Sequence, residues 1–181
     1  DRLKLDRTRI TGLADALREL AALPDPVGSV VRGQTLANGL RMRQVRVPMG
    51  VVGAICAWNV PLFITCNKMG AALAAGCSVV LKPAPETPMT GNYVAQLFIE
   101  AGVPAEAISV VTGGAETGQA LVAHPDVDKI TFTGSTAAGK AIGAACAQTL
   151  KRCSLELGGK SAAIVLDDVD LAANAFMLTF L

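Results

Sequence analysis

The spacing of hydrophobic residues changes near residue 50 and divides the chain into two differently organised regions. In the first region, apolar side chains recur at helical intervals over residues 8–23, which predicts a helix that Pro24 ends. Residues 40–47 alternate between apolar and polar side chains, a pattern typical of a half-buried strand. From residue 51 onward, short continuous apolar runs alternate with segments of helical periodicity, so we expect strands that are covered on both faces.

This alternation predicts an α/β fold. We expect strands at residues 51–57, 78–81, 108–111, 129–133, 153–157 and 162–166, and helices at residues 61–75, 88–101, 116–123, 137–150 and 170–181. Strands and helices in this order form a Rossmann-like parallel sheet with helices on both faces. Such sheets bind ligands at the carboxyl ends of their strands, so the candidate functional residues should directly follow the strands.

Composition narrows the possible classes of protein. The chain has 181 residues, of which 51% are hydrophobic and 17% charged, which suits a packed core and excludes a disordered polyelectrolyte. The net charge of +1 argues against a nucleic-acid partner, because such proteins neutralise phosphates with an excess of basic residues. Lys68 is the only charged residue between positions 48 and 81, so we expect that segment to be deeply buried.

Neither a membrane span nor a metal site is indicated by the sequence. The longest apolar stretch, residues 69–81, is interrupted by Gly70, Gly76 and Ser78 and is too short to cross a bilayer. The charged first ten residues do not resemble a signal peptide, and five irregularly spaced cysteines with one histidine form no metal-binding motif. We therefore expect a cytoplasmic protein with reduced thiols, no metal and no membrane partner.

The first two candidate sites follow the strands at 51–57 and 78–81. Asn59, next to Trp58, carries an amide that can donate a hydrogen bond to a developing oxyanion; the alternative is an asparagine that only shapes the turn before Pro61. Lys82 precedes a loop stiffened by three prolines and can reach a ribose or phosphate oxygen; the alternative is a solvated loop lysine.

Two further candidates follow the strands at 129–133 and 153–157. Gly134 and Ser135 form a turn into a helix whose N-terminus can hold a phosphate, and Gly139 lets that helix pack closely. The turn lacks the Gly-x-Gly-x-x-Gly pattern, so a purely structural turn is the alternative. Glu156 precedes Leu157 and Gly158 at the end of a buried-looking strand, where a carboxylate can act as a general base or be merely an exposed acid before a flexible turn.

Taken in order, these motifs strongly resemble the aldehyde dehydrogenase superfamily over residues 50–181. The resembling segments are GVVGAICAWNVPLF, ALAAGCSVVLKPAPETP, EAGVPAEAISVVTGG, ITFTGSTAAGK and LELGGKSAAIVLDDVDL. The resemblance implies the cofactor-binding part of an aldehyde dehydrogenase fold, NAD or NADP as the cofactor, and a small aldehyde as the substrate. It also implies that full-length relatives are homo-oligomers.

The resemblance also implies roles for individual residues. Asn59 matches the asparagine that holds the oxyanion, and Glu156 matches the general base that activates water. The implied cofactor contacts are Trp58, Lys82, Glu86, Gly134, Ser135, Gly139, Leu157 and Gly158. Pro85 stands where many NAD-preferring members carry a ribose-binding glutamate, and Glu86 lies one place later, so the choice between NAD and NADP stays open.

The resemblance divides the chain into three parts. Residues 1–49 form an N-terminal segment, residues 50–157 the dinucleotide-binding domain, and residues 158–181 the start of a truncated catalytic domain. None of the five cysteines matches the family's nucleophile, which lies in a later segment, so we expect no aldehyde oxidation by this chain alone.

The N-terminal third resembles a second branch of the superfamily. Residues 1–53, and above all PDPVGSVVRGQTLANGLRMRQVRVPMGVVG, are similar to glutamate-5-semialdehyde dehydrogenase, also called gamma-glutamyl phosphate reductase. The chain would then be a mosaic, or chimera, of two branches. The alternatives to aldehyde oxidation are therefore the reductive step of proline synthesis that this second branch catalyses, or a non-catalytic dinucleotide-binding fragment.

Overall fold

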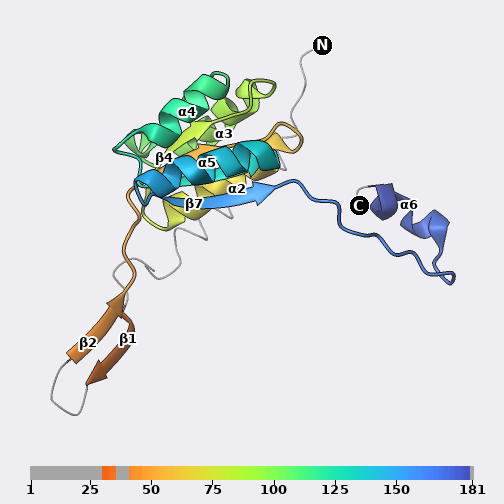
Figure 1. The fold of residues 1–181 in the computed structure, drawn as a ribbon, viewed down its shortest axis with the longest axis horizontal. Helices are drawn as coiled ribbons and strands as arrows, with labels where there is room; N and C mark the ends of the chain where they lie inside the picture. The colour runs from red at the N-terminus through yellow and green to blue at the C-terminus, as the bar shows by residue number, and fades with distance from the viewer. Residues whose placement is uncertain (1–29, 36–40, 180–181) are drawn as a thin grey trace.

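The computed structural model describes residues 30–35 and 41–179 (Figure 1). The helix expected over residues 8–23 lies outside the described residues. Strands β1 (Val30–Thr35) and β2 (Arg41–Val45) pair antiparallel in a two-stranded sheet of their own. The strand expected at 40–47 is confirmed by β2, whereas β1 was not predicted, because Gly33 in its middle is a residue type depleted in strands.

A five-stranded parallel sheet forms the main body and confirms the expected α/β fold. Its strands lie in the order β5-β4-β3-β6-β7. The elements are β3 (Val51–Ile55), α2 (Pro61–Ala74), β4 (Ser78–Lys82), α3 (Pro88–Glu100), a 3-10 turn (Ala105–Ala107), β5 (Ile108–Val110), α4 (Ala115–Ala123), β6 (Lys129–Gly134), α5 (Thr136–Gln148) and β7 (Arg152–Leu157).

The two faces of the sheet bury separate core clusters. On one face, Ala54 and Leu81 pack against α2 and α3 through side chains such as Phe98. On the other, Ile55 and Ile130 pack against α4 and α5. Ala54 and Ile55 are neighbours in β3 and face opposite clusters, which explains why this central strand is a continuous apolar run.

Proline and glycine mark the helix boundaries as the sequence indicates. Pro61 and Pro88 occupy the first positions of α2 and α3, where the missing N–H costs nothing. Gly76 and Gly102 follow the two helices with φ angles of +75° and +102°, and their N–H groups bond back to Leu73 and Ile99 carbonyls at 2.9 Å. These glycines end the helices because they adopt the left-handed backbone without steric cost.

The region after β7 departs from the expectation. Residues 162–166 form no strand, so that prediction is wrong; the apolar run has no neighbouring edge with which it pairs in the described part of the chain. The last helix is confirmed as α6 (Leu171–Thr179), which begins where the Asp170 carboxylate accepts hydrogen bonds from the N–H groups of Ala172 and Ala173. No described helix is long and apolar enough to cross a membrane.

Strand β7 is also less buried than its sequence suggests. It is the edge strand of the described sheet, and its residues are exposed or half-buried throughout. Cys153 on this strand is exposed, and Cys66 is half-buried, whereas Cys56, Cys77 and Cys146 are buried.

Two hydrogen bonds between Asp128 and Val51, here called the Asp128–Val51 latch, hold the start of the central strand β3. The Asp128 carboxylate accepts the Val51 N–H at 2.7 Å, and the Asp128 N–H donates to the Val51 carbonyl at 2.9 Å. Gly50 precedes this strand with a φ of +102°, and a Cβ built there would collide with the Asp128 carboxylate. Gly102 has the same φ, but a Cβ there would meet nothing within 4 Å.

This pair of glycines gives a matched test of the latch. Gly50→Ala should lower the free energy of unfolding by about 1–2 kcal/mol more than Gly102→Ala, because both variants strain the backbone but only the first displaces Asp128. Denaturant unfolding of both variants measures the difference. Equal losses would mean that Asp128 moves aside at no cost and that the latch contributes little.

Candidate functional site

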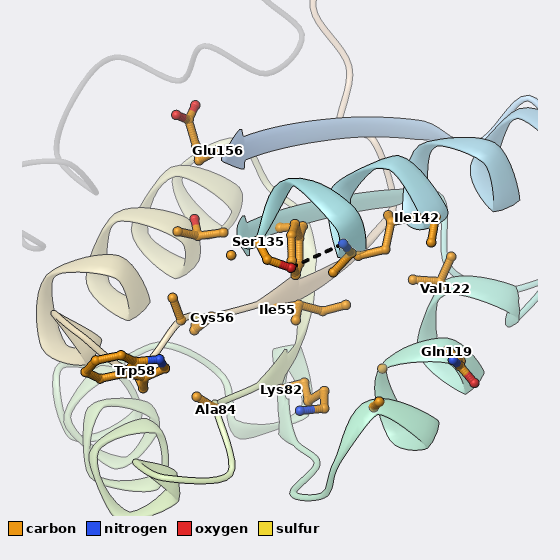
Figure 2. A pocket seen from close by; sticks show the side chains of 18 of the residues that line it. Ile55, Cys56, Trp58, Lys82, Ala84, Gln119, Val122, Ser135, Ile142 and Glu156 are labelled. Atoms are coloured by element: carbon orange, nitrogen blue, oxygen red, sulfur yellow. Dashed lines mark hydrogen bonds between the residues drawn. The ribbon is translucent and has the colours of Figure 1, made fainter. Parts of the chain in front are cut away.

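A cavity of about 990 Å³ opens at the carboxyl ends of the parallel strands (Figure 2). Strand β4 lies on one side of β3, and β6 lies on the other side. The helices that connect the strands therefore diverge at this point of the sheet, called the switch point, and leave a crevice. All of the predicted site residues except Gly139 line this cavity. They are Trp58, Asn59, Lys82, Glu86, Gly134, Ser135, Glu156, Leu157 and Gly158.

The turn from β6 into α5 is both a structural cap and part of the cavity wall. The Ser135 hydroxyl accepts a hydrogen bond from the Ala138 N–H at 3.2 Å and so caps α5 (Figure 2). A Cβ on Gly134 would lie 2.5 Å from Cζ of Phe132, so only glycine lets the chain turn this close to the ring. The positive end of the helix dipole consequently borders the cavity, an arrangement that suits an anionic ligand.

Gly139 acts through packing and does not line the cavity. It is buried in α5, and a Cβ built on it would collide with Cδ2 of Leu157 on β7. The expected close packing of this helix is confirmed. Leu157 itself lines the cavity, so Gly139 influences the site by setting how near β7 lies to α5.

Lys82 is a buried cation in the wall of the cavity. It is the last residue of β4 and only 5% exposed, so the interpretation as a solvated loop lysine is wrong. Its Nζ donates to the Pro83 carbonyl at 3.2 Å. Burial lowers the pKa of Lys82, and the nearby Glu86 carboxylate partly offsets that shift. An ammonium has three donors, so this side chain keeps hydrogen-bonding capacity for a ligand.

Asn59 and Glu156 line the cavity and are exposed. Asn59 follows β3 next to Trp58, whose ring is 63% exposed. Glu156 is exposed near the end of β7, in register with Thr133 of β6. Figure 2 shows Glu156 across the cavity from Lys82, with Ser135 between them. The cavity thus has a cationic wall on one side and an exposed carboxylate on the other.

Sequence reasoning did not assign a role to Lys68. Its side chain extends from α2, is 7% exposed and donates from Nζ to the Thr131 hydroxyl of β6 at 2.8 Å. Burial lowers the pKa of Lys68, while the proximity of Cys56 and Glu156 opposes the shift. The available signal was its position as the one charge in a long apolar segment, which predicted burial but gave no partner.

Comparison with known proteins identifies the family to which this architecture belongs. The profile of the aldehyde dehydrogenase family matches residues 2–180. The chain belongs to the aldehyde dehydrogenase family. It is similar to phenylacetaldehyde dehydrogenase of Pseudomonas fluorescens, with 59% identity over 126 residues, covering 69% of this chain and 25% of that protein. Mitochondrial succinate-semialdehyde dehydrogenase of Arabidopsis thaliana is 54% identical over 132 residues, covering 72% of this chain and 25% of that protein.

A solved aldehyde dehydrogenase shares the fold. The crystal structure of the Mycobacterium tuberculosis enzyme complexed with NAD+ superposes with a TM-score of 0.79 and 51% sequence identity. The match covers 93% of this chain and 35% of that chain. The chain therefore spans about a quarter to a third of the length of these aldehyde dehydrogenases.

The family match includes the N-terminal third. The match begins at residue 2, so the superfamily resemblance holds on both sides of residue 50. The finer likeness of residues 1–53 to glutamate-5-semialdehyde dehydrogenase, and the mosaic origin it suggests, stay predictions. Within the described part of this aldehyde dehydrogenase chain, no group of three or more His, Cys, Asp or Glu residues is arranged to hold a metal ion.

The buried Lys68 predicts a pH dependence of stability. The folded protein binds the Lys68 proton more weakly than the unfolded chain, whose lysines titrate near 10.5, so deprotonation favours the folded state. Between the lowered pKa and about 10.5, the unfolding free energy of the parent should therefore rise relative to that of Lys68→Met. Urea unfolding at a series of pH values measures this difference.

The control for this measurement is Lys140→Met, which removes an exposed lysine from α5. The difference in unfolding free energy between Lys140→Met and the parent should be constant over the same pH range. If the difference in unfolding free energy between Lys68→Met and the parent is also constant, burial does not disfavour the charged form of Lys68.

Proposed function

We propose that the cavity binds NAD or NADP, and that the chain is the nucleotide-binding part of an enzyme that oxidises an aldehyde to a carboxylic acid. One observation carries the proposal. The capped N-terminus of α5 and the buried ammonium of Lys82 border the same cavity at the switch point of the sheet. Dinucleotides bind at such switch points in open α/β sheets.

The residues present fit the chemical parts of a dinucleotide. The α5 N-terminus offers N–H groups and a positive dipole to the pyrophosphate, and Gly134 leaves room for a close approach. Lys82 supplies donors for ribose hydroxyls from a position where water does not compete. The solved relative from Mycobacterium tuberculosis, a complex with NAD+, supports the assignment.

The choice between NAD and NADP depends on the residues that follow Lys82. Glu86 is exposed and lines the cavity, so its carboxylate can accept hydrogen bonds from ribose hydroxyls and would repel a 2′-phosphate. The ammonium of Lys82 would instead attract that phosphate. Pro85 offers no side-chain donor or acceptor. Both nucleotides therefore stay in the proposal.

Asn59 and Glu156 are the groups we assign to the chemistry. The bound nucleotide supplies the hydride acceptor. The Asn59 amide donates a hydrogen bond to the oxyanion that develops at the substrate carbonyl, and the Glu156 carboxylate takes a proton from the hydrolytic water. Both residues line the cavity and are exposed, so substrate and water have access to them.

The cysteine that lines the cavity does not suit a nucleophile. Cys56 is 5% exposed, and burial raises the pKa of its thiol, so little reactive thiolate forms at neutral pH. We therefore retain the prediction that this chain alone does not oxidise aldehydes. Its similarity to enzymes named for phenylacetaldehyde and for succinate semialdehyde is comparable, so the comparisons favour neither of these aldehydes as the substrate.

Three further expectations accompany the proposal and stay predictions. The first is the division into residues 1–49, a dinucleotide-binding domain of residues 50–157, and the start of a catalytic domain at residues 158–181. The second is homo-oligomerisation of the whole enzyme. The third is a cytoplasmic location.

Calorimetric titration with NAD and with NADP tests the proposed function directly. We expect saturable binding of at least one nucleotide, and we expect Ser135→Trp to weaken it at least tenfold because the indole would fill the cavity beside the α5 N-terminus. The nucleotide with the higher affinity shows which one the Pro85–Glu86 loop accepts.

Ala137→Trp is the matched control, because Ala137 is exposed on the same helical turn and does not line the cavity. It should bind within about twofold of the parent, well below the tenfold change that 1.4 kcal/mol represents. Absence of binding by a parent chain with native circular dichroism would refute the proposal.

A second pair of variants separates binding residues from chemical ones. Lys82→Met should lower nucleotide affinity about tenfold or more, because a charge-assisted hydrogen bond to the ligand is lost. Glu156→Gln should leave the affinity nearly unchanged, since we assign Glu156 to water activation. The same calorimetric titration measures the nucleotide affinity of both variants. An equal loss of affinity in the two variants would contradict these assignments.

A further inference from the structure

Helix α5 packs on strand β7 through an ordered ladder of contacts. Gly139 lies against Leu157, where a Cβ on the glycine would collide, and a Cβ on Gly143 would lie 3.6 Å from Cδ1 of Leu155. The helix runs antiparallel to the strand, as the helix of a β-α-β unit does. A step of three or four residues along the helix, roughly 5–6 Å, therefore matches a step of two residues along the strand, roughly 6.6 Å.

The next step of this ladder brings Cys146 opposite Cys153. Cys146 lies one turn after Gly143 on α5, and Cys153 lies two residues before Leu155 on β7. Figure 1 shows α5 lying along β7 throughout this region.

The strand register independently places the two thiols on one face of the sheet. Cys153 pairs with Ile130 of β6, and in a parallel pair residues in register point to the same face. Ile130 and Cys146 belong to the same core cluster, so Cys153 faces the layer that contains Cys146. In agreement, burial and then the proximity of Cys153 raise the pKa of the Cys146 thiol.

The two thiols differ in access to solvent. Cys146 is 1% exposed, whereas Cys153 is exposed. All five cysteines lie in the described part of the chain, and Cys153 is the exposed one among them. An oxidant from solution therefore reaches Cys153 first, and Cys146 is positioned as the resolving thiol.

We propose that Cys146 and Cys153 form a thiol pair that a low-molecular-weight disulfide, such as oxidised glutathione, converts to an intramolecular disulfide. The Cys153 sulfur attacks one sulfur of the reagent, whose S–S bond breaks, and its proton leaves with the first released thiol. The Cys146 sulfur then attacks the Cys153 sulfur, and its proton leaves with the second thiol. Two protein thiols are thereby oxidised and the reagent is reduced to two thiols.

This inference goes beyond the proposed function, because neither cysteine lines the cavity. Cys153 is near the start of β7, whereas Glu156 and Leu157 at its end line the cavity. The link would close the turn that contains Leu150, which has a φ of +56° and is 91% exposed. It would therefore fasten the edge strand to α5 without entering the nucleotide site.

Peptide mapping of the full chain tests the proposal. The protein is incubated with oxidised glutathione under native conditions, free thiols are alkylated on denaturation, and trypsin is added. Cleavage after Lys140, Lys151, Arg152 and Lys160 places the two cysteines on separate peptides, residues 141–151 and 153–160. We expect these peptides to be joined by a disulfide and to separate on treatment with dithiothreitol.

Two variants establish the order of the exchange. Cys146→Ala should trap glutathione on Cys153, because no resolving thiol remains, and Cys77→Ser should leave the link unchanged. The proposal is overturned if the parent chain carries stable glutathione on Cys153 while Cys146 stays alkylatable. It is also overturned if the parent, with Cys56 and Cys77 still protected from native alkylation, forms neither the adduct nor the link.

Discussion

The parallel pairing of β3 with β6 is the constraint on which the site depends. These strands are distant in sequence, and the two halves of the sheet extend from them in opposite directions. Right-handed crossovers then place the helices of each half on opposite faces, so no helix crosses the carboxyl ends of this pair. The Asp128–Val51 latch fixes the amino ends of the same strands, and the cavity opens at the other ends.

Burial of Lys68 and Lys82 carries an electrostatic cost in the described part of the fold. Each ammonium loses most of its hydration and finds one neutral acceptor, the Thr131 hydroxyl for Lys68 and the Pro83 carbonyl for Lys82. Neither acceptor carries a charge, so the cost is only partly offset within the chain. Such a cost is expected where a protein reserves donors for a ligand or a reaction, and both lysines lie near groups that we assign to those tasks.

The sequence predicted the inner strands well because β3 and β4 are short, mostly apolar runs bounded by glycine or proline. The rule that ligands bind at strand ends also located the cavity residues, since it depends on connectivity rather than on detailed packing. Periodicity failed for residues 162–166, an apolar run that pairs with no strand in the described part of the chain. It also could not show that Lys82 is buried, because Gly118, against which its stem packs, lies on α4, far away in sequence.

The position of Glu156 shows how local packing places the carboxylate that we assign to water activation. Strand β7 is the edge of the described sheet, held by β6 on one side and by α5 above it. The absence of a side chain at Gly139 lets α5 approach Leu157, and this contact sets how close the end of β7, which carries Glu156, lies to α5. The same helix presents Ser135 to the cavity. A shift of α5 would therefore move the turn that carries Ser135 together with the strand end that carries Glu156, as long as the contact between Gly139 and Leu157 is kept.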